Sequence, residues 1–302
     1  MKQLDILAEA LQTKNCTVSQ NEPMKHHTSF KIGGPAELFA VPHDEETLAY
    51  MLSFCHEHGI KTTIIGNGSN LLAADEGISG LVIKIGKGLD QITMEGENRI
   101  LCDAGVPLSK LCSFALSQSL SGLEFAWGIP GLAGGAAFMN AGAYGGEMKD
   151  VLSGCYHLDK TGQKGALRGD ELDLSYRNSA YSTNGHIVTG LVLELRKGVE
   201  SDIRAAMQEY MQRRTDKQPL DLPSAGSVFK RPPGQFAGTL IESCGLKGYS
   251  VGGAQVSEKH AGFIVNTGNA TCRNVLELIK FIQQEVYNRH QIMLECEVKT
   301  IA

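Results

Sequence analysis

A 21-residue segment, residues 127–147 (WGIPGLAGGAAFMNAGAYGGE), constrains the fold most, because it holds seven glycines and five alanines and almost no charge. A surface loop of this length would be more polar. Each glycine in a helix interior would cost roughly 0.8–1.0 kcal/mol relative to alanine. Backbone of this kind can approach a large planar or phosphorylated ligand closely and hold it through N–H groups. We therefore predict ligand contact here, with close-packed structural turns as the alternative.

Composition and charge limit the class of protein. The chain has 302 residues, 42% hydrophobic and 20% charged, which is typical of a soluble globular protein of about two domains. A net charge of −5 with dispersed basic residues disfavours nucleic-acid binding. No apolar run approaches the roughly 18 residues of a membrane span. Asp5 and Glu9 interrupt the apolar stretch of residues 1–15, which favours an amphipathic helix over a signal peptide. We expect a cytoplasmic protein without membrane insertion.

The eight cysteines contain no C-x-x-C pair and no metal-type cluster with histidine. Most lie in apolar surroundings, so we expect buried reduced thiols and no metal site.

Periodicity predicts an α+β fold. The expected helices cover residues 44–58, 107–118, 201–214 and 273–290, and a fifth lies at the N-terminus. The expected strands cover residues 62–65, 81–85, 100–102, 187–195, 262–265 and 293–301. Helices and strands do not alternate as in a doubly wound parallel sheet. A proline-bearing linker at 215–224 suggests a larger domain before it and a smaller one after it.

A second glycine-rich segment, residues 64–72 (IIGNGSNLL), follows a strand-like run. It has G-x-G but Leu71 stands where the dinucleotide fingerprint requires its third glycine, and no helix follows. The P-loop pattern is absent from the sequence. Free N–H groups, with the Ser69 and Asn70 side chains, could form an anion-binding concavity. A plain strand-to-strand turn is the alternative.

Three further motifs carry polar side chains. Arg177 in LSYRNSAY offers a cation suited to bidentate recognition of a carboxylate or phosphate. Ser227 in PSAGSVFKRPPG could be a turn serine, an anion ligand or a residue that takes part in chemistry. In MLECEVKTI, residues 293–301, alternation places Leu294, Cys296 and Val298 on one strand face and the charged residues 295, 297 and 299 on the other.

Seven segments in order resemble one family, the UDP-N-acetylenolpyruvoylglucosamine reductases. Those resembling its flavin domain are residues 27–37, 64–72, 122–147 and 175–179. Those resembling its second domain are residues 224–232, 254–266 and 294–301. The agreement extends from about residue 24 to the end, although the chain departs from the usual family pattern at Trp127, Leu132 and Thr239.

The resemblance implies an FAD-binding domain of the PCMH or vanillyl-alcohol-oxidase type and a smaller α+β substrate-binding domain. The implied division is an N-terminal helical segment (1–25), the FAD domain (26–196), a helix and linker (197–222) and the substrate domain (223–302). Only 49 residues, 178–226, separate Arg177 from Ser227, as in the shorter variety of the family without the tyrosine-bearing lid insertion.

The implied activity is NADPH-dependent, FAD-mediated reduction of UDP-N-acetylglucosamine enolpyruvate to UDP-N-acetylmuramate in peptidoglycan synthesis, by a monomer. Hydride would pass from reduced flavin to the enolpyruvyl β-carbon. By motif match, Ser227 would protonate the α-carbon. Arg177 and a protonated Glu297 would stabilise the enolate.

Matching the motifs also implies binding residues. The expected FAD contacts, mainly through backbone, are Ile65, Gly66, Asn67, Gly68, Ser69, Asn70, Gly128, Pro130, Gly131, Gly134, Gly135, Asn140, Gly142 and Ala143. The expected substrate contacts are Tyr176, Lys230 and His260.

Two other functions compete. An FAD oxidase of the same fold would pass electrons to oxygen, but it would not need a proton donor for a reduced alkene. A non-catalytic nucleotide-sugar sensor could retain the pocket, but such a relic should have lost a catalytic residue.

Overall fold

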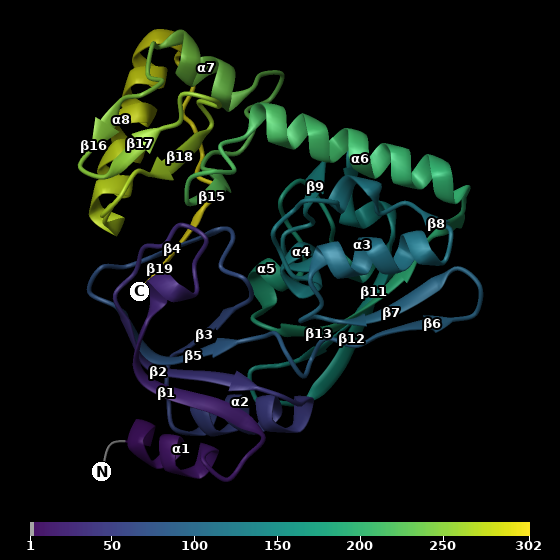
Figure 1. Ribbon diagram of the computed structural model, residues 1–302. Helices are drawn as coiled ribbons and strands as arrows, with labels where there is room; N and C mark the ends of the chain where they lie inside the picture. The colour runs from purple at the N-terminus through teal and green to yellow at the C-terminus, as the bar shows by residue number, and fades with distance from the viewer. Residues whose placement is uncertain (1–2) are drawn as a thin grey trace. The chain divides into compact units, whose positions relative to one another are not determined.

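The computed structural model describes residues 3–302 (Figure 1). It contains two compact units. The first consists of residues up to 20, 38–67 and 80–213, and the second of residues 21–37, 68–79 and 214–302. The second unit therefore takes two short segments from the early part of the chain in addition to the C-terminal third.

A four-stranded sheet lies mainly in the first unit. Its strands, in spatial order, are β1 (Cys16–Pro23), β2 (Pro35–Pro42), β5 (Ile78–Lys84) and β3 (Thr62–Ile65). The first two helices of the chain are α1 (Gln3–Leu11) and α2 (Glu45–Glu57). The Asp44 carboxylate accepts a hydrogen bond from the Thr47 amide at 2.7 Å, so α2 begins at a side-chain cap.

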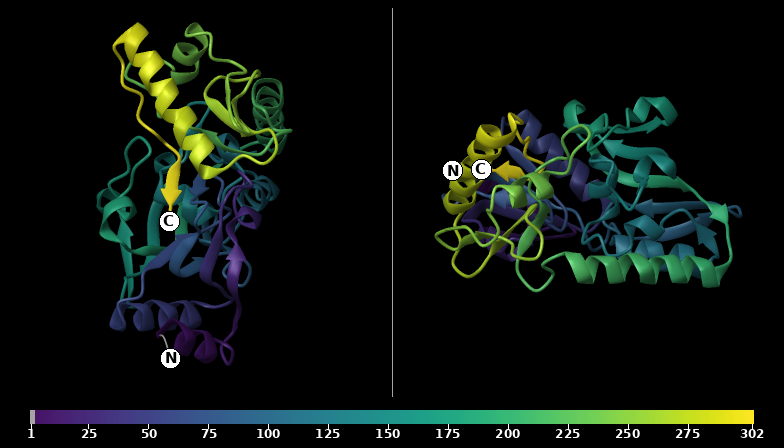
Figure 2. Two further views of the ribbon diagram at one scale, coloured as in Figure 1. Left: turned by 90° about the vertical axis from the view of Figure 1, so that its left-hand side faces the viewer. Right: turned by 90° about the horizontal axis from the view of Figure 1, so that it is seen from above.

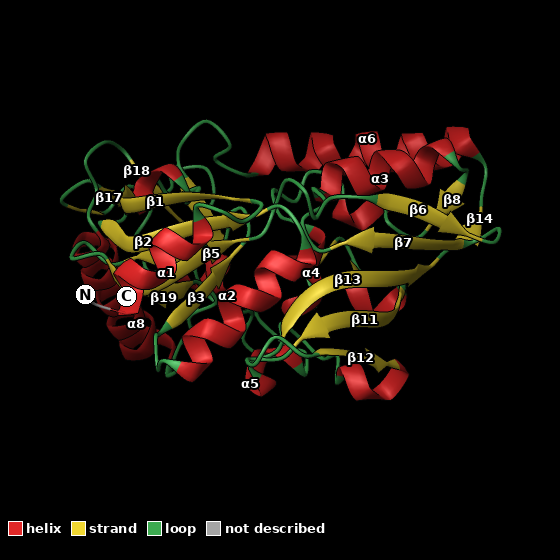
Figure 3. Ribbon diagram, turned by 90° about the horizontal axis from the view of Figure 1, so that it is seen from below, coloured by secondary structure: helices red, strands yellow, loops and turns green. Residues whose placement is uncertain are grey.

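A five-stranded antiparallel sheet forms the rest of this unit's β-structure. Its strands, in order, are β12 (Lys164–Arg168), β11 (Leu152–Leu158), β13 (Ile187–Glu194), β7 (Arg99–Asp103) and β6 (Ile92–Glu95), and Figure 3 shows them side by side. The helices of this part are α3 (Leu108–Ser117), α4 (Ala133–Phe138), α5 (Tyr181–Asn184) and α6 (Glu200–Lys217). Helix α4 packs against the central strand β13, in which seven of eight residues are buried.

Short pairs and turns complete the unit. Strands β8 (Leu120–Ser121) and β14 (Arg196–Lys197) pair with each other, as do β9 (Gly142–Ala143) and β10 (Gly146–Glu147). The 3₁₀ turns in this unit are η2 (Glu124–Ala126), η3 (Met148–Asp150) and η4 (Gly169–Leu172).

The second unit has its own sheet and core. The sheet order is β15 (Ser224–Ser227), β18 (Phe263–Asn266), β17 (Ala254–Val256) and β16 (Ser250–Val251), with helices α7 (Ala237–Ser243) and α8 (Cys272–His290). The turn η1 (Met24–His26) lies in this unit, and β4 (Leu71–Ala73) pairs in parallel with β19 (Lys299–Ile301). Figure 2 shows the yellow C-terminal segment leaving α8 and running to β19.

The α+β class is confirmed, and the four helices predicted with bounds are present with ends within three residues of those expected. The predicted N-terminal helix is also present but ends at Leu11, and residues 1–2 of it lie outside the described residues. Five of the predicted strands are also present within three residues. The sixth, 293–301, is wrong as a continuous strand, because only residues 299–301 form one. Residues 293–298 make a single isolated bridge, Phe229 to Cys296. The predicted alternation holds in part: Leu294 and Val298 are buried, but Cys296 and Glu297 are both only half-buried.

Candidate active site

Most glycines of the 127–147 segment are required by the protein's own packing. A Cβ on Gly134 would lie 2.6 Å from the Ala104 Cβ, and one on Gly146 would lie 2.8 Å from the Phe125 ring. Gly145 has a φ of +90°, which disfavours other residues. Close-packed turns therefore explain much of the glycine content.

Gly135 differs from these glycines. It is exposed, its φ lies outside the left-handed region, and a Cβ there would meet no heavy atom within 4 Å. Neither packing nor conformation requires glycine at this position. Close approach of a ligand to the backbone is another physical reason for a glycine at this position.

The expectation that a segment so rich in glycine would not be helical is wrong for residues 133–138, which form α4. The helix is short, and its first residues are held by tertiary contacts. The Gly134 amide donates to the Ala104 carbonyl at 2.9 Å, and the Ala133 amide donates to the Val106 carbonyl at 2.8 Å. Packing that needs a residue without a side chain outweighs the low helix propensity of glycine.

The structure brings the two predicted flavin loops together within the first unit. The Asn67 side chain donates to the Pro130 carbonyl at 3.4 Å. A Cβ on Gly66 would lie 3.2 Å from the Leu132 side chain. Strand β3 ends at the buried Ile65, so the loop begins at a fixed point. As predicted, no helix follows the 64–72 segment, and it leads into strand β4, as the alternative of a strand-to-strand turn implies.

The remaining residues of that loop belong to the second unit. Gly68 has a φ of +63°, and a Cβ there would lie 2.1 Å from the His27 carbonyl oxygen. The Asn70 side chain donates to the Glu297 carbonyl at 3.2 Å. This bond ties the end of the glycine loop to the segment that carries the predicted catalytic glutamate.

Arg177 lies at the tip of a tight hairpin turn in the first unit. Ser175 and Asn178 exchange two backbone hydrogen bonds, of 3.2 and 3.1 Å. Arg177 itself has a φ of +55°, a left-handed conformation that is uncommon for a non-glycine residue. Its guanidinium Nη2 donates to the Gly142 carbonyl at 3.1 Å, and its guanidinium carbon lies 5.3 Å from the centre of the half-exposed Tyr176 ring. The turn therefore connects Arg177 to the glycine segment.

Asn140 was predicted as a flavin contact, and the structure shows how its side chain is used. The residue is completely buried with a φ of +43°. Its amide nitrogen donates to the Ser175 carbonyl at 2.9 Å and to a Glu147 carboxylate oxygen at 2.6 Å. Its oxygen accepts from the Lys149 amide at 2.9 Å. Analysis of the sequence missed Glu147, although this glutamate closes the same glycine-rich motif seven residues after Asn140.

Ser227 and Glu297 lie in adjacent segments of the second unit. The Glu297 amide donates to the Val228 carbonyl at 2.7 Å, and the Val228 amide donates to the Gly262 carbonyl at 2.9 Å. The register of β15 is interrupted between Ser224 and Ser227. Interruptions of this kind redirect side chains at functional sites. Backbone hydrogen bonds thus join the segments of Ser227 and Glu297, which lie 70 positions apart in the sequence.

The other predicted substrate residues of this unit have protein partners. The ammonium group of Lys230 pairs with the Glu295 carboxylate, and the Lys230 amide donates to the Glu295 carbonyl at 2.8 Å. The His260 Nδ1 accepts from the Gly262 amide at 3.1 Å. Burial lowers the pKa of His260, which favours the neutral form of the ring.

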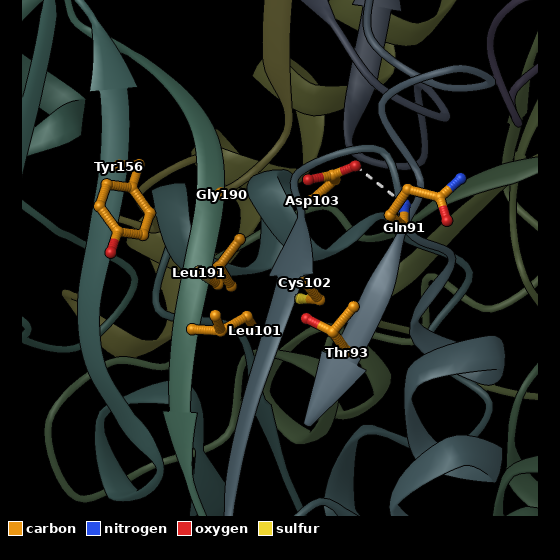
Figure 4. A pocket seen from close by; sticks show the side chains of 8 residues that line it. All are labelled: Gln91, Thr93, Leu101, Cys102, Asp103, Tyr156, Gly190 and Leu191. Atoms are coloured by element: carbon orange, nitrogen blue, oxygen red, sulfur yellow. Dashed lines mark hydrogen bonds between the residues drawn. The ribbon is translucent and has the colours of Figure 1, made fainter. Parts of the chain in front are cut away.

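A shallow pocket of about 260 Å³ lies elsewhere in the first unit, on the five-stranded sheet (Figure 4). Three residues on neighbouring strands form a row across the pocket. Tyr156 pairs with Gly190, and Gly190 pairs with Asp103. The Gln91 amide donates to the Asp103 carboxylate at 2.9 Å. None of the predicted site residues lines this pocket or a second of about 300 Å³ that shares Tyr156.

Over residues 3–302, no three His, Cys, Asp or Glu side chains are grouped to hold a metal ion. All eight cysteines are free thiols, six of them buried. Within the same range, every helix is too short or too polar to span a bilayer.

Comparisons with known proteins identify two domain types in the chain. Residues 218–301 match the C-terminal domain of UDP-N-acetylenolpyruvoylglucosamine reductase, and residues 36–164 match an FAD-binding domain.

Curated relatives match nearly the whole chain. The UDP-N-acetylenolpyruvoylglucosamine reductase of Alkaliphilus oremlandii is 49% identical over 281 residues, which cover 93% of this chain and 92% of the relative. That of Syntrophomonas wolfei is 48% identical, covering 93% and 94%. Among solved structures, the reductase from Thermus caldophilus is similar with a TM-score of 0.82 and 34% identity, over 95% of this chain and 99% of that chain.

Proposed function

The chain belongs to the UDP-N-acetylenolpyruvoylglucosamine reductase family, and from this we propose that it reduces UDP-N-acetylglucosamine enolpyruvate to UDP-N-acetylmuramate with NADPH, for peptidoglycan synthesis. It is an FAD-dependent oxidoreductase. NADPH as the electron source and the roles of individual residues are our assignments.

The neutral glycine-rich backbone fits a large flavin dinucleotide. Exposed Gly135, which has open space where a side chain would be, and the joined loops around Gly66 and Pro130 would hold it mainly through backbone groups. We retain the fourteen flavin contacts expected from the sequence as part of the proposal, except Asn140, whose side chain bonds within the protein. When bound and reduced, the flavin supplies hydride for the enolpyruvyl β-carbon.

The chain's own residues handle the charge and the proton. Hydride addition at the β-carbon places negative charge on the α-carbon and the neighbouring carboxylate. In our proposal, Arg177 and a protonated Glu297 hydrogen-bond the carboxylate and stabilise this enolate. Ser227 donates its proton to the α-carbon, for which a carbanionic enolate is a strong acceptor. Positioned proton transfer of this kind is worth about 10²- to 10⁴-fold in rate.

One observation carries the assignment of Ser227 and Glu297. Their segments are joined by the 2.7 Å hydrogen bond from the Glu297 amide to the Val228 carbonyl. Two residues that act on the same three-carbon group need such proximity, and the sequence separates them by 70 positions. The bulged register of β15 supports a specific direction for the serine hydroxyl.

Several coarser assignments complete the proposal. We assign Tyr176, Lys230 and His260 to substrate binding. We keep the division into an FAD domain (26–196) and a substrate domain (223–302). We also propose a cytoplasmic location, because the substrate is a charged nucleotide sugar, and we retain the expected monomer as part of the proposal.

An anaerobic assay tests this function. We expect purified protein to carry FAD, and its oxidation of NADPH without oxygen to depend on UDP-N-acetylglucosamine enolpyruvate. Absence of flavin after purification, with no binding of added FAD, would contradict the flavoenzyme assignment. Bleaching of the flavin by NADPH with no reoxidation by the enolpyruvyl substrate would contradict the specific reaction.

The same assay separates the competing functions. An oxidase would be reoxidised by oxygen and not by the enolpyruvyl compound. A nucleotide-sugar sensor would bind the substrate without oxidising NADPH.

A further inference from the structure

We propose that Asn140, held by Glu147, is a positioning residue for Arg177. The proposal rests on the assigned role of Arg177 in the proposed function. It reassigns Asn140, whose side chain turns away from any ligand and into the protein.

The Asn140 side chain uses its hydrogen-bonding capacity inside the protein. Its two N–H groups go to the Ser175 carbonyl and the Glu147 carboxylate, and its oxygen accepts from the Lys149 amide. Because two partners are pure acceptors and the third is a pure donor, only one orientation of the amide satisfies all three. The residue is 0% exposed, so water cannot replace a lost partner.

Glu147 fixes the amide from the other side. One carboxylate oxygen accepts from Asn140 at 2.6 Å, and the other lies 2.5 Å from the Lys149 ammonium. The Glu147 amide also donates to the Asp150 carboxylate at 2.8 Å. A hydrogen bond to an ionised carboxylate is roughly twice as strong as one between neutral groups. Glu147 therefore anchors Asn140 more firmly than a neutral acceptor would.

The network reaches Arg177 at two points. Asn140 bonds to the carbonyl of Ser175, the residue that opens the hairpin turn. Two residues along, the Gly142 carbonyl accepts from the Arg177 guanidinium at 3.1 Å. Residues 140 and 142 thus hold residues 175 and 177, respectively. The first contact sets the base of the turn and the second sets the direction of its side chain.

The conformation of Arg177 explains why such support is needed. A φ of +55° is disfavoured for arginine, and surrounding contacts must maintain it. Glycine would adopt this conformation without strain but would carry no guanidinium. The buried Asn140 amide therefore holds Arg177 in a left-handed backbone conformation that glycine would adopt without strain.

Two variants test the role. Asn140→Asp keeps the shape but removes both donors and sets a second carboxylate against Glu147. Glu147→Gln keeps an acceptor and loses the charge, so it is the milder change. We expect kcat/KM for the enolpyruvyl substrate to fall about 100-fold in the first, as for an approximately 1 Å displacement of a reacting group, and less in the second. Reduction of bound flavin by NADPH should stay within about twofold in both.

A double-mutant cycle distinguishes positioning from general destabilisation. If Asn140 acts through Arg177, Asn140→Asp should cause almost no further loss in an Arg177→Ala background. Full additivity of the two losses, or equal loss in both half-reactions, would overturn the proposal. Asn98→Ala is the matched control in the same unit, because its amide donates to the Leu195 carbonyl at 3.3 Å away from the turn.

Limited trypsin digestion gives a measurement that needs neither substrate nor flavin turnover. Cleavage after Arg177 should be several-fold faster in Asn140→Asp and in Glu147→Gln than in the wild type or in Asn98→Ala, because the turn opens more often. Unchanged cleavage at Arg177 would overturn the proposal even if activity were lost. Wild-type protein that fails to reduce the enolpyruvyl substrate, yet shows the expected cleavage pattern, would contradict the proposed function alone.

Discussion

The Arg177 turn and the Ser227 segment are held in place by different means. In the first unit, the side chains of buried Asn140 and half-buried Glu147 support a turn that two main-chain hydrogen bonds close. In the second unit, main-chain hydrogen bonds such as Glu297 to Val228 fix the serine and the glutamate. Main-chain bonds survive most substitutions, whereas a side-chain network fails when one member changes. We therefore expect the position of the Arg177 side chain to change when remote residues are substituted. The position of Ser227 should change chiefly when its own backbone is altered.

Replacing the serine hydroxyl should have the largest effect and should leave the segment intact. We expect Ser227→Ala to slow flavin reoxidation by the enolpyruvyl substrate about 10²- to 10⁴-fold, because the proposed proton donor is removed. Reduction by NADPH and the thermal midpoint should change little. Stopped-flow absorbance of each half-reaction measures the split. Comparable losses of rate in both half-reactions would mean that Ser227 has a structural role. The Ser227 side chain would then support its own segment, contrary to the comparison with the Arg177 turn.

A backbone change beside the serine should have an intermediate effect. Gly226 has a φ of +74° and open space where a Cβ would be, so Gly226→Ala introduces strain without a clash. We expect a loss of about 1–2 kcal/mol in the free energy of unfolding, and slower reoxidation by substrate. Urea unfolding followed by circular dichroism measures the first quantity. Unchanged stability and kinetics would show that the serine segment tolerates backbone change as well as side-chain change.

A side-chain contact near the serine should matter least. Glu295 pairs with Lys230, but its side chain is 71% exposed, and exposed ion pairs contribute about 0–1 kcal/mol. Glu295→Gln should therefore leave unfolding within about 1 kcal/mol of wild type and kcat/KM within a few-fold. Steady-state kinetics at two salt concentrations would check this. A loss approaching that of Asn140→Asp would show that side chains also control the serine region.

Sequence patterns predicted the parts of the fold that depend on periodicity. Helices α2 and α8 were predicted from the sequence because a capped start and an apolar stripe, respectively, are specified by local chemistry. Helix α4 was missed because tertiary packing against Ala104 decides its conformation, against the propensity of its glycines. The strand expected at residues 293–298 failed because an alternating pattern specifies burial and not hydrogen-bond partners.

The candidate site was predictable only as a set of motifs. Ser227 and Glu297 were matched from separate segments, and their proximity follows from pairing that no local pattern reveals. Asn140 was expected to contact a ligand because it stands in the glycine-rich motif. Its three internal partners, including Glu147, depend on where the Ser175 turn folds back, and that information is not local.

The isolated bridge between Phe229 and Cys296 has a consequence for the oxidation of one thiol, because it holds Cys296 partly buried. Cys296 is adjacent to Glu297, and burial together with the charge of Glu295 raises the pKa of its thiol. Peroxide attacks the thiolate form, which is scarce when the pKa is raised. We therefore expect added peroxide to oxidise the Cys296 thiol more slowly than an exposed, unperturbed cysteine.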